Sequence, residues 1–270
     1  MPINKNIITN QINKSEYDDL DAINYSGLKQ FMISPAHYFH WKNNKVESDN
    51  QAFAIGNAVH CLALEPSEFT SKFVVAPDVD RRTKEGKRIW EEFKATADGK
   101  QIINEDDYRQ SLSIAKAVIE NPVFQTYATE GAIVESGLHT ELHGNEFKCR
   151  MDLYDSTLNT IVDIKTYTGN VTTANITSEI FKRGYDIQSY CYREAVKNIV
   201  GKLPNFVFIF VEKDAPYAVN TCVIGDTNHA RTGEYVEKAL TRFANCKSTQ
   251  IWPSYTNSTS PHIIEPKQFV

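Results

Sequence analysis

Three segments in the second half of the chain alternate apolar and polar residues in the manner of β-strands, and they limit the possible folds more than any other feature. They are residues 132–139, 146–154 and 160–167. Short polar stretches, Gly144-Asn145 and residues 156–159, supply the turns between them. The chain therefore predicts three successive strands, of which the second and third form a hairpin.

Helices and further strands are predicted on the C-terminal side of these segments. Helices are expected over residues 172–182, 186–200 and 226–246, and a further strand over residues 217–224. The continuous apolar run from Asn205 to Val211 predicts a central strand that is buried on both faces. The order strand, strand, strand, helix, strand favours one α/β domain.

The first half of the chain is predicted to be a helical elaboration of that domain. Ser26 has the residue type and position of an N-cap for a short helix, and Pro35 restarts a helix at its first position. Residues 51–64 are apolar enough for a buried helix, and Asn104 is expected to cap another. The predicted organisation is a flexible arm (1–24), a single domain (25–250, with the elaboration over 25–130 and the core over 131–250) and a C-terminal tail (251–270).

Composition excludes several classes of protein. The 270 residues are 41% hydrophobic and carry a net charge of −5, which fits a globular core and excludes disorder and coiled-coil rods. The longest strongly apolar run, Phe206 to Val211, is far shorter than the roughly 20 residues of a membrane span. No secretory signal is visible at the N-terminus. The five cysteines form no CxxC pair, so they are read as reduced thiols rather than as a zinc ribbon or disulfide framework.

Two aspartates and a lysine on the predicted hairpin carry the strongest chemical signal. Asp152 lies on the second strand, and Asp163 and Lys165 lie on the third. Side chains alternate along a strand, so Asp163 and Lys165 share one face, and the hairpin can place Asp152 beside them. Neighbouring carboxylates repel each other unless a cation or a proton lies between them. Oxygen ligands of this kind suit Mg²⁺, although a solvated, lysine-paired acidic face is the plainer interpretation of a lone DxK.

Two helical pairs accompany the acidic residues. Gly56 and His60 stand at positions i and i+4 of the predicted apolar helix, and Gln188 and Tyr192 have the same spacing on a later helix. Glycine permits close approach of a ligand, and a neutral imidazole can complete a metal site. The amide and the phenol could contact a phosphate or a base. Taken alone, His60 is more typical of a hydrogen-bonded core histidine than of a ligand, and a half-buried helix face explains Gln188 and Tyr192 equally well.

Together these elements resemble the PD-(D/E)xK nuclease superfamily. The order of GxxxH helix, Asp strand, (D/E)xK strand and QxxxY helix is that of its RecB-like branch. Within that branch the chain is most similar to RecE-type (exonuclease VIII) nuclease domains of phages and prophages, through YSGLKQFMISPAHY, IGNAVHCLALEP and DRRTKEGK. The resemblance covers about Tyr25 to Cys246. It implies an αβββαβ core, with a mixed central sheet flanked by helices and an N-terminal helical elaboration.

The resemblance also implies a metal site. His60, Asp152 and Asp163 would bind Mg²⁺, helped by the backbone carbonyl of Ile164, and Mn²⁺ would substitute for Mg²⁺. Mg²⁺ at such a site neutralises phosphate oxygens and lowers the pKa of a bound water.

Further roles follow from the same resemblance. Lys165 would position or activate the attacking water, and Glu135 on the preceding strand would hold a second metal ion or a metal-bound water. Met151 stands where the literal signature has proline. The cysteine spacings do not fit the iron–sulfur members of the branch, so no cluster is expected.

Several residues are candidates for DNA contact. Five basic residues with a single acid among them form the first candidate set: Arg81, Arg82, Lys84, Lys87 and Arg88. They could grip the DNA backbone or reach a 5′-phosphate, and a solvated helix face is the competing interpretation because Glu91 and Glu92 follow. Arg150, on the strand face of Asp152, is expected near the scissile phosphate or paired with that aspartate. Gln188 and Tyr192 complete the set.

The function that the resemblance implies is a Mg²⁺-dependent 5′-to-3′ double-strand DNA exonuclease. Its product, a 3′ single-stranded tail, would be loaded with a RecT-like annealing protein for recombination. The resemblance further implies a toroidal tetramer in the cytoplasm of a bacterial host, encoded by a phage or prophage. The alternatives are a RecB-like endonuclease or single-strand nuclease, a catalytically silent DNA- or partner-binding module of the same fold, and an unrelated α/β metal enzyme in which the motif order is accidental.

Overall fold

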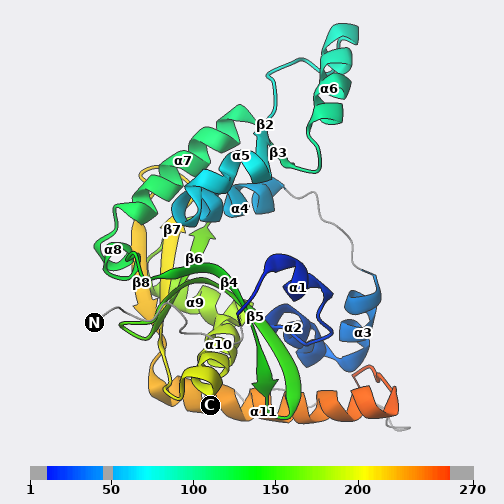
Figure 1. Ribbon diagram of the computed structural model, residues 1–270, viewed down its shortest axis with the longest axis vertical. Helices are drawn as coiled ribbons and strands as arrows, with labels where there is room; N and C mark the ends of the chain where they lie inside the picture. Colours follow the sequence, from blue (N-terminus) through cyan, green and yellow to red (C-terminus); the bar gives the residue numbers. More distant parts are fainter. Residues whose placement is uncertain (1–10, 45–50, 256–270) are drawn as a thin grey trace, which may run out of the picture.

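A six-stranded mixed sheet forms the centre of the protein (Figure 1). The computed structural model describes residues 11–44 and 51–255, without the side chains of residues 51–53. The strand order is β1-β4-β5-β6-β7-β8. The bounds are β1 Gln11–Ile12, β4 Ile133–Leu142, β5 Asn145–Asp155, β6 Thr160–Tyr167, β7 Asn205–Glu212 and β8 Val219–Val223. Neighbouring strands are antiparallel except β6 and β7, which run parallel because two helices cross over between them.

Helices cover both faces of this sheet, which confirms the α/β fold with a mixed central sheet. The N-terminal helices are α1 Lys14–Asp19, α2 Tyr25–Ile33, α3 Pro35–Asn43, α4 Gln51–Leu64, α5 Phe69–Lys72, α6 Lys84–Thr96, α7 Glu105–Ile119 and α8 Pro122–Tyr127, with a 3₁₀ turn at Pro66–Glu68. The C-terminal helices are α9 Thr173–Arg183, α10 Tyr185–Val200 and α11 Asp226–Thr249. None of the described helices combines the length and the hydropathy that a membrane span needs.

Strand β7 separates the two main hydrophobic cores. Its phenylalanines, such as Phe208, belong to the core that also contains residues of α2, α10 and α11. The aliphatic residues between them, such as Ile209, belong to the core under α4, α7 and α8. Residues 206–211 are each 5% exposed or less, so the strand is buried on both faces as predicted.

Two predicted boundaries are shifted in the structure. The β4–β5 turn is His143-Gly144, one residue earlier than predicted, with φ of 46° and 73°. Both values are positive, which is what a two-residue hairpin turn requires. Helix α2 is capped by Asn24, whose side chain accepts a hydrogen bond from the Gly27 N–H at 2.8 Å, and Ser26 lies inside the helix.

The prediction of a flexible arm over residues 1–24 is wrong for its described part, residues 11–24. Strand β1 pairs with β4, and α1 follows it. Lys148 on β5 is only 8% exposed and donates hydrogen bonds to the carbonyls of Tyr17 and Leu20. These contacts fix a segment whose polar composition alone predicts no structure. Residues 1–10 of the arm, and residues 256–270 of the predicted tail, lie outside the described part of the chain.

A second segment, separate from residues 1–24, stands out from the body in Figure 1, and from here on this segment alone is called the arm. It consists of β2 (Phe73–Val75), α6 and β3 (Gln101–Ile103), and β2 and β3 pair in parallel at its base. These three-residue strands are too short to show a periodicity, so the sequence does not predict them.

Substitution by alanine should change the stability of the fold in opposite directions at two glycines that lie inside helices. A Cβ at Gly56 on α4 would meet only Thr166 Oγ1, at 3.8 Å, so Gly56→Ala should stabilise the fold by about 1 kcal/mol through helix propensity. A Cβ at Gly233 on α11 would lie 2.7 Å from the buried ring of Tyr190, an overlap that costs about 1–3 kcal/mol. Urea unfolding of both variants checks this. A Gly233→Ala variant as stable as Gly56→Ala would contradict the packing of α10 on α11.

Candidate metal centre and cleft

Strands β5 and β6 separate where the acidic residues lie. Their last paired residues are Leu153 and Val162. Beyond that point the Asp152 carboxylate accepts a hydrogen bond from the Ile164 N–H at 2.7 Å, so a side chain takes the place of a backbone partner. This hydrogen bond fixes the Asp152 carboxylate in the fork, the gap where β5 and β6 diverge.

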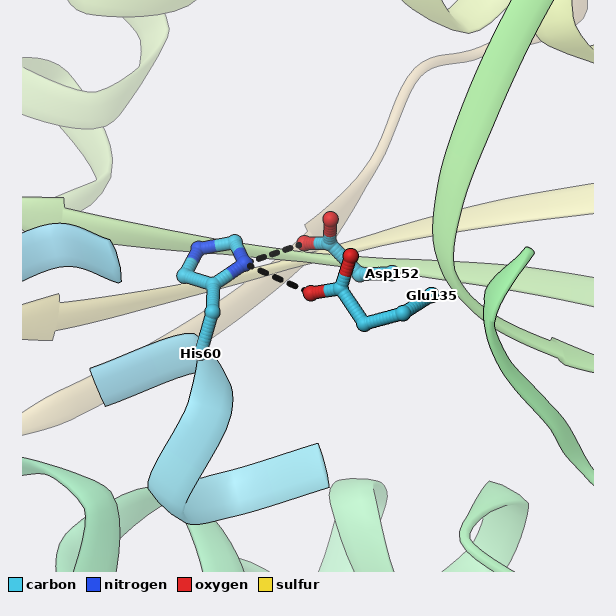
Figure 2. A group of neighbouring side chains, drawn as sticks. All are labelled: His60, Glu135 and Asp152. Carbon is cyan, nitrogen blue, oxygen red and sulfur yellow. Dashed lines mark ion pairs between the residues drawn. The ribbon is translucent and has the colours of Figure 1, made fainter. Parts of the chain in front are cut away.

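His60 reaches this fork from helix α4 (Figure 2). Its Nδ1 lies 3.4 Å from Asp152 Oδ2 and 3.8 Å from Glu135 Oε1. Its Nε2 lies 3.0 Å from the carbonyl oxygen of Ile164, which can only accept, so Nε2 carries a proton. In the neutral imidazole, Nδ1 therefore presents a lone pair to the two carboxylates. Ile164, expected to offer its carbonyl to the metal, here orients the imidazole.

Glu135 completes the group and has an unusual backbone. Its φ is 46°, in the left-handed region that L-residues with side chains rarely adopt. Strain of this kind persists where the surrounding structure fixes it, often at functional sites. Arg150 on β5 forms an ion pair with Glu135, with Nε 2.9 Å from Oε2. Arg150 is thus paired with Glu135, where pairing with Asp152 was the predicted alternative to a phosphate contact.

Asp163 and Lys165 share a face of β6 as predicted, and that face lies against α10. Asp163 is 3% exposed, with Oδ2 2.5 Å from Lys165 Nζ and Oδ1 2.6 Å from the Gln188 amide nitrogen. The Lys165 ammonium lies 4.6 Å above the ring of Tyr185, the first residue of α10. Asp163 is therefore held among Lys165 and Gln188, and it is not one of the three residues whose donor atoms converge.

A cleft of about 1110 Å³ opens over this group. His60, Glu135, Arg150, Asp152 and Lys165 line it. Further basic residues in its lining are Lys14, Lys72, Lys182, Arg183 and Lys213, of which Lys72 is paired with Glu65 and Arg183 with Glu179. A cleft of this volume with several cations in its lining can admit a chain of phosphates.

Mutual proximity shifts the pKa values of the buried groups. Burial opposes protonation of His60, but the charges of Asp152 and Glu135 outweigh it and raise the pKa of His60 to about 10. Burial and the charge of Asp152 raise the pKa of Asp163 to about 6, against the opposing effect of Lys165. Burial also opposes the charge of Lys165, yet Asp163 and Asp152 raise the pKa of Lys165 above its usual range. Lys165 therefore stays a cation at neutral pH.

The donor set fits a divalent metal ion. One donor atom from each of His60, Glu135 and Asp152 lies within 4.8 Å of the other two. Two carboxylates and an imidazole suit Mn²⁺ well and Mg²⁺ acceptably, because Mg²⁺ uses few protein carboxylates and keeps several waters. The concentration of negative charge at the fork favours a cation there.

The structure corrects two predicted DNA contacts. Gln188 and Tyr192 are 5% and 8% exposed. Gln188 donates to Asp163, and Tyr192 packs in the hydrophobic core near Phe206, so neither side chain is free to meet DNA. Their helical spacing is therefore typical of a packed face, with Gln188 supporting the site from behind.

The basic segment lies outside the cleft, on the arm. It consists of Arg81, Arg82, Lys84, Lys87 and Arg88, all exposed. Arg82 pairs with Asp80, while Arg88 pairs with Glu85 and Glu92. The structure thus separates these residues from the metal group.

Sequence reasoning missed Tyr185, whose ring lies under Lys165. Its position three residues before Gln188 on the same helix was the available signal, because residues at i and i+3 share a helix face.

The fold and the site define a PD-(D/E)xK-like domain: a mixed sheet with one acid on each of two diverging strands and a lysine two residues after the second acid. The chain belongs to the family described as PDDEXK-like domain of unknown function (DUF3799), whose model matches residues 24–260. This excludes the interpretation that the motif order is accidental.

A solved structure shares this fold. The chain is similar to a protein from Eubacterium rectale described as a "putative exonuclease", with a TM-score of 0.65, 17% sequence identity and 96% of each chain covered. At this identity the likeness shows the fold alone, and it confirms the predicted fold class. A search of curated proteins finds no match.

Metal binding should release a proton. In the metal-free protein His60 stays protonated up to its pKa of about 10, so a metal that takes Nδ1 must displace that proton. The apparent affinity for Mn²⁺ should therefore rise about tenfold per pH unit between pH 7 and 9. Calorimetry in buffers of different ionisation enthalpy should give about one proton released. His60→Gln should bind more weakly and release almost none. Equal release from both proteins would contradict the assignment of His60.

Proposed function

We propose that this protein is a nuclease that depends on a divalent metal ion, and more narrowly a Mg²⁺-dependent 5′-to-3′ exonuclease on double-stranded DNA. The observation that carries the proposal is the convergence of His60, Glu135 and Asp152 in a cleft, with Lys165 on the adjacent strand. Membership of a PDDEXK-like family and the description of the structural neighbour as an exonuclease support the nuclease. The polarity and the preference for duplex ends rest on the RecE-type resemblance.

The proposed mechanism assigns each residue one task. His60, Glu135 and Asp152 would hold the metal ion, which supplies charge neutralisation at the phosphate and a more acidic bound water. Lys165, kept protonated by its neighbours, holds a positive charge and hydrogen-bond donors at the edge of the cleft, where it orients the attacking water. Arg150 keeps the Glu135 carboxylate in place and offers its remaining guanidinium N–H groups to a phosphate oxygen.

Buried neighbours keep Lys165 in position. Asp163 fixes the ammonium from below, and the Gln188 amide fixes Asp163. The face of Tyr185 supports the same ammonium through its π electrons. Two direct contacts on this flexible side chain reduce the entropy that it must lose when substrate binds.

The wider role follows the same resemblance. The product would be a 3′ single-stranded tail, the partner a RecT-like annealing protein, and the assembly a toroidal tetramer with a basic lumen. A phage- or prophage-encoded protein would act in the cytoplasm of the bacterial host. These assignments are part of the proposal.

A digestion time course tests the proposed function. Linear duplex DNA with a 5′ label on one strand and a 3′ label on the other is incubated with Mg²⁺ or with EDTA, and circular duplex runs in parallel. Early release of the 5′ label, an intact circle and no cleavage in EDTA are the expected results.

Other outcomes would replace parts of the proposal. Early release of the 3′ label would keep the exonuclease and reverse its polarity. Cleavage of the circle would establish an endonuclease. DNA binding without any cleavage in Mg²⁺ or Mn²⁺ would establish a silent binding module.

A further inference from the structure

Helix α6 is an amphipathic helix that projects from the rest of the described chain. It stands away from the body of the protein in Figure 1, and no described helix or strand packs extensively along it. Its one fully buried residue between Lys84 and Thr96 is Gly86, which lies against the backbone of Asp80. The helix is therefore held by its own loop, and its apolar side is not used to stabilise the core.

The apolar side of α6 is aromatic. Ile89, Trp90 and Phe93 lie within one face of the helix, and each is partly exposed. The rings of Trp90 and Phe93 have centroids 5.6 Å apart and planes inclined by 36°. Two adjacent aromatic rings form a surface of the size and polarity on which a nucleobase stacks.

Cations lie beside this aromatic face. The guanidinium of Arg81 lies 4.5 Å above the ring of Trp90. Lys87 stands three residues before Trp90 and Lys94 four residues after it, along one border of the face, and Lys94 is paired there with Glu91 at 2.9 Å. On the other border the acids Glu85 and Glu92 are both paired with Arg88. Arg81 and Lys87, which lie nearest to the Trp90 side of the face, are therefore the cations that complement a polyanion.

The base of the arm is part of the cleft. Phe73 on β2 and Gln101 on β3 line it, and Gln101 accepts a hydrogen bond from Asn57 on α4 at 3.1 Å. Asn57 is three residues before His60 on the same helix. A DNA strand that leaves the metal group along the cleft therefore meets the base of the arm.

From these observations we propose that α6 binds single-stranded DNA, with its bases stacked on Trp90 and Phe93 and its phosphates beside Arg81 and Lys87. This inference rests on the proposed nuclease function and assigns its substrate a second contact. Stacked duplex bases do not present their faces, so the site selects unpaired nucleotides. A protein partner would need apolar area without the surrounding cations.

Anisotropy of a labelled oligothymidine tests the proposal in EDTA, where no cleavage is needed and a failed nuclease assay does not affect the result. Trp90→Ala should weaken binding roughly 5- to 150-fold. Trp90→Phe, which keeps a ring, should retain most of the affinity. Tyr235→Ala, which removes a 51% exposed aromatic ring from α11, is the matched control and should change nothing.

Salt dependence separates stacking from charge. Lys87→Gln should reduce the slope of log affinity against log salt by about 0.7, whereas Trp90→Ala should leave that slope unchanged. Blunt duplex should bind Trp90→Ala and the native protein equally. Wild-type affinity of Trp90→Ala and Phe93→Ala for the oligonucleotide would overturn the proposal. A lower molar mass of these variants with unchanged DNA affinity would also overturn the proposal, because it would show that α6 binds a second copy of the chain.

Discussion

Asp152→Asn should lower Mg²⁺-dependent DNA cleavage on the order of 10²- to 10³-fold while the protein stays folded. The asparagine oxygen can still accept the Ile164 N–H, so the fork between β5 and β6 keeps its geometry. What is lost is the negative charge that faces His60 Nδ1 at 3.4 Å. Initial rates on end-labelled duplex, with circular dichroism and metal titration on the same samples, measure the effect.

Asp155→Asn provides the matched control for this variant. Asp155 is a buried aspartate on the same strand, but it accepts the N–H groups of Thr157 and Leu158 in the β5–β6 turn. Asp155 does not line the cleft, so the cleavage rate of Asp155→Asn should stay within about twofold of wild type. Equal losses from both variants would show that the strand is sensitive in general and would remove the special role of Asp152.

Lys165→Met should affect both activity and stability. Methionine keeps most of the side-chain length but removes the cation, so cleavage should fall on the order of 10²-fold. Asp163, 3% exposed, would lose its 2.5 Å ion pair, and breaking a buried pair costs about 3 kcal/mol. Urea unfolding and cleavage rates on the same preparation measure the two losses.

The stability loss of Lys165→Met should depend on pH. Burial already raises the pKa of Asp163 to about 6, and removal of Lys165 raises it further. A carboxyl whose pKa is higher in the folded state costs stability as pH rises above the unfolded value of about 3.9. The penalty should therefore be small at pH 4 and large at pH 7.

A second substitution separates stability from catalysis. In Asp163→Asn/Lys165→Met both charges of the pair are removed, so neither is left buried without its partner, and the asparagine oxygen can still accept the Gln188 amide. Stability should return to within about 1 kcal/mol of wild type, whereas cleavage should not recover. Recovery of cleavage together with stability would show that Lys165 acts only through folding.

Local sequence patterns predict the strands and helices whose structure depends on their own residues. Strand β7 is recognisable because its residues are apolar on both faces, and β5 and β6 because a short polar turn joins them. Residues 11–24 are different: Lys148 holds that segment through contacts with backbone carbonyls, which any sequence would offer. The sequence of residues 11–24 itself does not predict this contact.

The same distinction applies to the site. The alternation of β6 places Asp163 and Lys165 together, and the hairpin brings Asp152 to the same end of the sheet. The divergence of the two strands is a tertiary feature, however, and it directs Asp152 toward His60 and Glu135 while Asp163 turns to Gln188. Helical spacing alone likewise cannot tell that Gln188 and Tyr192 face the interior.

The docking of the N-terminal segment has a consequence for synthesis on the ribosome. The hydrogen bonds from Lys148 to Tyr17 and Leu20 span 131 and 128 residues. At typical translation rates the segment therefore waits on the order of ten seconds for its partner to be made. The segment is made before its partner strand and docks late, and its polar composition suits an interval spent in water.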